Sequence, residues 1–181
     1  RDVQALAAHP RIESLSFGLM DFVSAHRGAI PLSAMGVKGQ FDHPLVVRAK
    51  LEIAAACHAE GKVPSHCVVT EFKHTAALQD AAELAARRFG YARMWSIHPA
   101  QIRPIVDAFT PTVAEIDQAI EILQAAQAAH WAPIRHHDTL HDRASYRYFW
   151  QLLERAHRTS FADGPQLPGE VRAAWFDEGA A

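Results

Sequence analysis

Residues 12–21 read Ile-Glu-Ser-Leu-Ser-Phe-Gly-Leu-Met-Asp, and this stretch decides the fold class. Its apolar residues form a short β-compatible run, which predicts a buried strand. Gly18 lets the backbone pass close to another group, and Asp21 stands where the strand is expected to give way to a loop. Ligands of parallel α/β proteins bind at this end of the strands. Asp21 is therefore a candidate ligand for a hard cation such as Mg²⁺.

A structural role for Asp21 is the alternative. Aspartate caps turns and helix starts well, because its carboxylate accepts hydrogen bonds from nearby backbone N–H groups. The residues alone leave both roles open.

Helical and strand patterns alternate outward from this stretch. Strands are predicted over 63–69 and 93–97, and helices over 44–60, 75–88 and 100–109. A long loop is predicted from Val23 to His43, in a place where long loops are commonly functional. The alternation of strand and helix indicates βα units on a parallel sheet, which is an α/β fold.

The C-terminal part has a different character. Thr112 and Glu115 form a predicted capping box for a helix that runs to about His130. Residues 134–142 are rich in His and Asp, and 144–158 form an aromatic helical pattern. We interpret 1–130 as the main domain and 131–181 as an extension that contacts a neighbouring subunit. The alternative is that the aromatic stripe is simply core.

Composition excludes several functional classes. The formal net charge of the 181 residues is −2, so no electrostatic footprint for nucleic acid or an anionic membrane is present. No apolar run approaches the length of a membrane-spanning helix, and no signal peptide is recognisable. Cys57 and Cys67 lack CxxC spacing and are expected to be reduced core residues of a cytoplasmic protein.

Three segments together carry a family resemblance: residues 15–21, Leu-Ser-Phe-Gly-Leu-Met-Asp; residues 68–73, Val-Val-Thr-Glu-Phe-Lys; and residues 95–102, Trp-Ser-Ile-His-Pro-Ala-Gln-Ile. Their order, spacing and strand context resemble those of the citrate lyase beta-subunit-like family. That family is part of the HpcH/HpaI aldolase superfamily and includes malyl-CoA and citramalyl-CoA lyases. The resemblance is good over residues 1–130 and loose in the tail.

The resemblance implies a (β/α)₈ TIM barrel that cleaves or forms a C–C bond beside a CoA thioester. It also implies Mg²⁺ held by a Glu after the fifth strand and an Asp after the sixth, to which Asp21 corresponds. A complete barrel needs about 250 residues. We therefore expect the chain to hold the last three βα units and a helical C-terminal extension. The absence of an initiator Met before Arg1 agrees with a fragment.

The resemblance implies further site residues and an assembly. Asp142 resembles an acid that the extension of some relatives offers to the next subunit, although it can equally cap the following helix. Gly18, His98 and Pro99 are expected to bind substrate, with a structural role as the alternative for His98. A homo-oligomer, trimer or hexamer, is expected.

Two positions depart from the family pattern. Many relatives carry an Asp where this chain has Ser65 and His66, and another where it has His74. These positions can shape the acyl pocket. The substrate, an acyl-CoA or a small hydroxy acid, therefore stays open.

The resulting hypothesis is a Mg²⁺-dependent retro-Claisen lyase for a malyl-, citramalyl- or citryl-CoA-like ester. Its alternatives are an aldolase for a free hydroxy-oxo acid and a non-catalytic binding subunit. The sequence His136-His137-Asp138 with His141 and Asp142 suggests a zinc site, although such clusters are mostly surface loops. Nucleophile elbow, P-loop and dinucleotide motifs are missing from the sequence.

Overall fold

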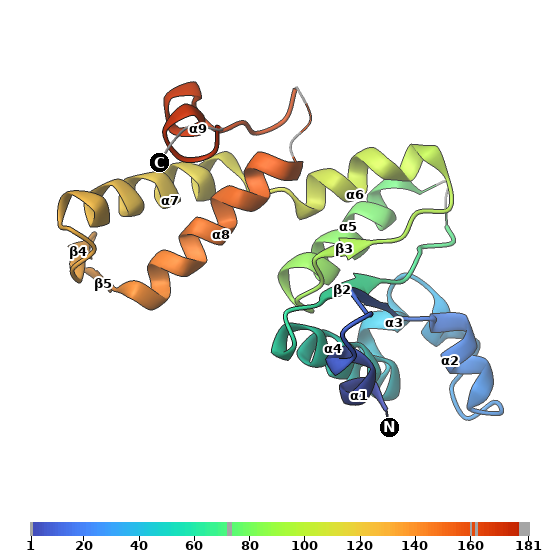
Figure 1. The fold of residues 1–181 in the computed structure, drawn as a ribbon. Helices are drawn as coiled ribbons and strands as arrows, with labels where there is room; N and C mark the ends of the chain where they lie inside the picture. The colour runs from blue at the N-terminus through green and yellow to red at the C-terminus, as the bar shows by residue number, and fades with distance from the viewer. Residues whose placement is uncertain (1, 72–73, 160, 162, 178–181) are drawn as a thin grey trace. The chain divides into compact units, whose positions relative to one another are not determined.

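The computed structural model describes residues 2–71, 74–159, 161 and 163–177. The chain forms two compact units, Arg1–Phe109 and Thr110–Ala181, which are described separately (Figure 1). The division falls before the boundary that the sequence suggests at residue 130, because the helix after Thr112 packs within the second unit. Phe72 and Lys73, from the second family-like segment, lie outside the described residues.

Unit 1 is built on a parallel sheet, which confirms the predicted α/β class. Its strands are β1 (Ser14–Ser16), β2 (Val63–His66) and β3 (Arg93–Met94), in the order β1-β2-β3. Ser14 lies opposite Val63, and Ser65 lies opposite Arg93. Both pairings are parallel, so the carboxyl ends of all three strands lie at one edge of the sheet.

Helices precede or follow each strand of this sheet in the sequence. The helices α1 (Val3–Ala8) and α4 (Pro44–Ala59) precede β1 and β2, α5 (Thr75–Arg87) follows β2, and the 3₁₀ turn η2 (Pro99–Gln101) with α6 (Ile102–Phe109) follows β3. Pro44 is the first residue of α4, as its fixed φ favours. Beyond the end of α4, Gly61 adopts φ +65°, which costs a glycine little. These bounds agree with the predicted helices.

The first strand is shorter than predicted. It ends at Ser16, and Gly18 starts the helix α2 (Leu19–Ala25), which buries Leu19 and Val23. The expected loop over 23–43 is also wrong in part, since it contains the end of α2, the 3₁₀ turn η1 (Leu32–Met35) and α3 (Gly39–Asp42). The apolar residues after Gly18 therefore form the buried face of a helix. A short apolar run is compatible with a strand or with a helix, so the sequence could not separate the two.

Unit 2 is a helical layer with one hairpin. It contains α7 (Val113–Ala128), α8 (Arg143–Thr159), α9 (Gly169–Trp175) and a hairpin of β4 (Ile134–His136) and β5 (Thr139–His141). The capping box is confirmed: the Thr112 N–H donates to Glu115 Oε2 at 2.7 Å, and the Glu115 N–H donates to Thr112 Oγ1 at 3.2 Å.

The aromatic stripe of α8 lies in the core of unit 2. Tyr146, Phe149 and Leu153 are buried together with Ile116 and Leu123 of α7. The alternative that this stripe is core is thus what the structure supports for these side chains.

The His- and Asp-rich segment is a hairpin instead of an irregular loop. His137 and Asp138 form its turn with φ of 44° and 61°, as the central residues of a type I′ turn require. His137 and His141, which are four residues apart in the sequence, therefore do not share one face of a helix. Within the described residues, no helix combines the length and apolarity that crossing a membrane requires.

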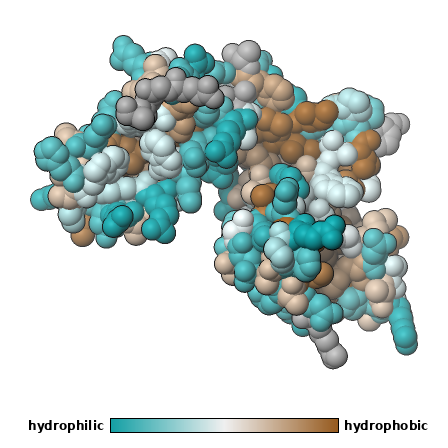
Figure 2. All heavy atoms as spheres, viewed as in Figure 1, coloured by the Kyte–Doolittle hydropathy of each residue, from teal (hydrophilic) through white to brown (hydrophobic). Residues whose placement is uncertain are grey.

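Large apolar side chains are exposed after β3 and at the start of α6. Trp95, Ile97 and Ile102 each expose half or more of their surface. In Figure 2, hydrophobic atoms gather over this part of unit 1. Exposed apolar clusters commonly mark contact surfaces.

Candidate functional site

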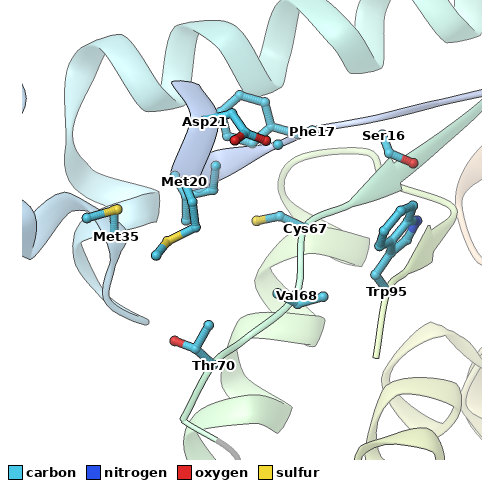
Figure 3. A pocket seen from close by; sticks show the side chains of 11 residues that line it. Ser16, Phe17, Met20, Asp21, Met35, Cys67, Val68, Thr70 and Trp95 are labelled. Carbon is cyan, nitrogen blue, oxygen red and sulfur yellow. The ribbon is translucent and has the colours of Figure 1, made fainter. Parts of the chain in front are cut away.

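A pocket opens at the carboxyl ends of the three parallel strands (Figure 3). Its volume is about 320 Å³. The wall is formed by the segment after β1, by residues that follow β2 and β3, and by one residue of η1: residues 16–21, Cys67, Val68, Thr70, Trp95 and Met35. This is the edge at which α/β proteins bind ligands.

Asp21 lies in the wall of this pocket, in the first turn of α2. The positive end of the helix dipole favours a carboxylate at this position. A Cβ placed on Gly18 would lie 3.0 Å from Asp21 Oδ2, so the glycine leaves room for the carboxylate. Among the described residues, neither a hydrogen bond nor an ion pair occupies that carboxylate. It is therefore available to a ligand from the pocket.

A buried polar cluster lies behind the pocket wall. Lys50 on α4 is fully buried, and its Nζ donates to Gln40 Oε1 at 2.7 Å and to His66 Nε2 at 2.8 Å. The Nδ1–H of His66 donates to the Cys67 carbonyl at 3.0 Å, which leaves Nε2 as the acceptor for Lys50. The Cys67 thiol donates to Gln40 Oε1 at 3.3 Å. Cys67 connects this cluster to the pocket.

Burial shifts the protonation of the cluster. Desolvation lowers the pKa of Lys50 from 10.5 to about 8. Desolvation, with a smaller contribution from the Lys50 charge, lowers the pKa of His66 from 6.5 to about 3. Burial raises the pKa of the Cys67 thiol. At neutral pH the cluster thus holds an ammonium group, a neutral imidazole and a thiol.

The Lys50 charge is stabilised by neutral groups. Its Nζ lies 4.1 Å from the centroid of the Phe41 ring, a cation–π distance. The Phe41 ring is stacked on His66, with centroids 5.3 Å apart. The sequence signal for this cluster is a lysine on the apolar face of α4, four residues after Val46.

His98 and Pro99 lie outside the pocket wall. The Ala100 N–H donates to His98 Nδ1 at 3.2 Å, so His98 caps the 3₁₀ turn that Pro99 begins. This is the structural role that we gave as the alternative for His98. Substrate binding by Gly18, His98 and Pro99 stays a prediction.

Gln101, in the same family-like segment, has a structural role that we did not predict. Its buried side chain donates from Nε2 to the Val69 carbonyl at 2.8 Å and accepts from the Ile97 N–H at 2.9 Å. It thereby ties the segment after β2 to the segment after β3, next to the pocket.

Asp142 lies in unit 2, directly before α8. Its Oδ1 accepts from the Ala144 N–H at 2.9 Å, which is the hydrogen bond of a helix N-cap. Capping leaves the second carboxylate oxygen available, so a role for Asp142 in a neighbouring subunit stays a prediction.

Comparisons with known proteins place this site in context. The sequence matches no family model. An L-malyl-CoA/beta-methylmalyl-CoA lyase of Rhodobacter capsulatus is 27% identical over 135 residues, which cover 68% of this chain and 41% of that lyase. Lyases of the same name from Cereibacter sphaeroides are 26–27% identical over equal shares.

Solved structures with a fold similar to that of this chain are also known. A citrate lyase from Burkholderia xenovorans LB400 is 60% identical, with a TM-score of 0.82 over 97% of this chain and 53% of its own. The protein CitE of Mycobacterium tuberculosis, solved with magnesium, acetoacetate and coenzyme A, has a TM-score of 0.69 over 85% of this chain and 55% of its own. At 20% identity, that likeness concerns the fold alone. The chain spans less than half the length of the curated relatives and about half that of these two structures.

Proposed function

We propose a function from one premise, which is that this chain belongs to the citrate lyase beta-subunit-like family. The proposed activity is Mg²⁺-dependent cleavage of a C–C bond in a 3-hydroxyacyl-CoA thioester. In this proposal the chain supplies the last three βα units of a TIM barrel, and the remaining units come from a longer protein. The names of the malyl-CoA lyases and of the 60% identical citrate lyase support this direction.

The observation that carries the proposal is the position of Asp21. Its unpaired carboxylate lies in a pocket of about 320 Å³ at the carboxyl edge of a parallel sheet. Barrel enzymes place their catalytic groups at this edge. A helix cap alone would not require the carboxylate to line a pocket.

The residues of the site fit a magnesium ion in part. Mg²⁺ is commonly held by one or two carboxylates, substrate oxygens and waters. Asp21 supplies one such ligand, and the second carboxylate that the family resemblance implies would come from an earlier barrel unit. When bound, Mg²⁺ would supply positive charge to the substrate oxygens and to the enolate that cleavage produces.

The residues of this chain have distinct tasks in the proposed reaction. Asp21 would hold the cation at the carboxyl edge of the sheet. Phe17, Leu19 and Val68 provide an apolar wall that limits water near the enolate. As the C–C bond breaks, a base from another barrel unit would take the proton of the 3-hydroxyl group, which becomes a carbonyl. Asp142, in the site of a neighbouring subunit of a homo-oligomer, would then donate a proton to the enolate carbon.

The substrate differs in one respect from those of relatives with an Asp on the second strand. Ser65 and His66 stand where those relatives carry the Asp. Both are fully buried, and His66 bonds Lys50. It therefore acts on the pocket through Cys67 and adds no charge to its wall. We propose a less polar acyl group than a second carboxylate near this strand would bind.

Thioester release by the full-length protein tests the function. A panel of 3-hydroxyacyl-CoA esters is assayed with Mg²⁺, with EDTA and with the variant Asp21→Asn. We expect both treatments to lower kcat by at least about 100-fold, since charge stabilisation commonly contributes that much. Asp42→Asn, at an exposed site of α3, is the control and should keep full activity. Magnesium binding is measured separately by calorimetry.

The outcomes separate the alternatives. Turnover that is independent of Asp21 contradicts our placement of the site. Magnesium binding without turnover of any ester favours an aldolase for a free hydroxy-oxo acid. Neither binding nor turnover favours a non-catalytic binding subunit.

Subunit mixing tests Asp142. Asp21→Asn and Asp142→Asn homo-oligomers should each be inactive, and mixed oligomers should regain part of the activity if Asp142 acts in the next subunit. Full activity of Asp142→Asn alone would leave it as a helix cap only.

A further inference from the structure

Three side chains that can bind a metal ion converge in unit 2, on the hairpin and on α7. Glu121 Oε2 lies 3.3 Å from His136 Nε2 and 4.0 Å from His137 Nε2. One ligand atom from each of the three residues lies within 4.8 Å of those of the other two. The residues come from two separate elements, with α7 supplying the carboxylate and the β4–β5 hairpin supplying both imidazoles.

The hairpin fixes the two histidines next to each other. His136 ends β4 opposite Thr139, and His137 begins the two-residue turn. Their rings are nearly perpendicular, with centroids 4.2 Å apart. An ion pair between Arg135 and Asp138 spans the same turn. Adjacent strand residues normally point to opposite faces. His137 instead begins the turn with φ +44°, and the Nε2 atoms of both histidines lie within 4.0 Å of Glu121 Oε2.

The base of the cluster is anchored in the core. Ile134, which begins β4, packs against the apolar cluster of α7 and α8. The His136 side chain is only 18% exposed, whereas those of Glu121 and His137 are 59% and 82% exposed. One ligand is thus held in place, and the other two can adjust. Figure 1 shows the hairpin beside α7.

We propose that Glu121, His136 and His137 bind a Zn²⁺ ion, with water as the fourth ligand. Two imidazoles and a carboxylate are a ligand set that zinc uses at about 2.0–2.2 Å, and tetrahedral ligands then lie about 3.3 Å apart. The distance from Glu121 to His136 already has this value. Rotation of the exposed His137 and Glu121 side chains shortens the other distances.

This site is chemically distinct from the proposed site at Asp21. Mg²⁺ prefers oxygen ligands, whereas nitrogen ligands favour zinc-like ions. Without a metal, His136 Nε2 and Glu121 Oε2 lie 3.3 Å apart, at hydrogen-bond distance. With zinc, the carboxylate and the neutral imidazoles bind one cation. The ion would link the hairpin to α7 and would stabilise unit 2 by mass action.

Calorimetry on the full-length protein tests the site. The protein is stripped with EDTA, dialysed and titrated with Zn²⁺ in excess Mg²⁺, so that oxygen-only sites are already filled. We expect one zinc ion per chain, and at least tenfold weaker binding for His137→Ala and for Glu121→Gln. His9→Ala replaces an exposed histidine of unit 1 and is the matched control, with unchanged affinity. Asp21→Asn should also bind zinc as the wild type does.

Two further measurements complete the test. Co²⁺ in place of zinc should give the visible absorption of a tetrahedral site in the wild type and lose it in His137→Ala. Circular dichroism checks that the variants are folded. Both substituted positions are exposed, so we expect the variants to fold. The proposal is overturned if the wild type binds no more zinc than His137→Ala does, or if His9→Ala weakens binding equally.

Discussion

Replacing Lys50 by methionine should remove a pH dependence from the stability of unit 1. The ammonium group of Lys50 is fully buried, and its hydrogen-bond partners Gln40 and His66 are neutral. Desolvation lowers its pKa to about 8, from 10.5. The folded state therefore releases this proton at a lower pH than the unfolded chain does.

The sign and size follow from proton linkage. Between the folded pKa of about 8 and the unfolded value of 10.5, the unfolded chain binds more protons, so stability rises with pH. The contribution is fully present above the unfolded pKa and is lost as the pH falls through the folded pKa. A difference of about 2.5 pKa units corresponds to about 3 kcal/mol at full extent. About 2 kcal/mol of this would appear between roughly pH 7 and pH 9.5.

Urea denaturation of the wild type and of Lys50→Met at both pH values measures this contribution. The difference between the two proteins should change by about 2 kcal/mol over that range, since other titrating groups are common to both. At neutral pH the variant gains from the loss of a buried charge. It also leaves His66 Nε2 without its donor and Gln40 Oε1 with the weaker Cys67 thiol donor alone, so its net change there is small. Lys38→Met, at an exposed lysine, is the control. Parallel pH dependences of wild type and Lys50→Met would refute a lowered Lys50 pKa.

Three further predictions concern the fold. The pKa of His66 is lowered from 6.5 to about 3. Its stabilising contribution is therefore present above pH 6.5 and should be lost as the pH falls toward 3. The urea midpoint of His66→Gln should accordingly fall less between neutral and acid pH than that of the wild type. Thr112→Ala removes the capping box and should cost about 1 kcal/mol by urea denaturation, with an unchanged m-value. Gly39→Ala would place a methyl group against the Ser33 carbonyl oxygen and should lower the free energy of unfolding by about 3 kcal/mol. In Gly36→Ala the added methyl group would lie 3.5 Å from that oxygen, so this variant should lose far less stability. Equal thermal midpoints of the two variants would contradict the close approach at Gly39.

The parallel sheet and most helices were predictable because their signals are local. Pro44 and Gly61 mark the ends of α4, and Thr112 marks the start of α7, through backbone geometry that depends on few neighbours. The position of Asp21 at the carboxyl edge followed from the same alternation. Its placement in a helix did not, because the apolar residues around Gly18 suit a strand or a helical face equally.

The buried polar cluster depends on tertiary contacts. Gln40, Lys50 and His66 are separated in sequence, and only the folded chain brings them together. The hairpin at His136 and His137 was missed for a related reason. Its turn is formed by residues with positive φ other than glycine, and an Asn-Gly or Asp-Gly signal is missing at this turn. Glu121 enters the cluster from another helix, so sequence spacing could not include it.

The two hydrogen bonds of Gln101 affect how the pocket can adapt to a ligand. Because they bridge Val69 and Ile97, the segments after β2 and β3 cannot separate without breaking at least one of them. The opposite wall contains Met20 and Met35, whose unbranched thioether side chains change rotamer at low cost (Figure 3). One wall is thus rigid and the other plastic. Acyl groups of different size should be accommodated on the methionine side, and substitutions there should broaden or narrow substrate choice without loosening the sheet.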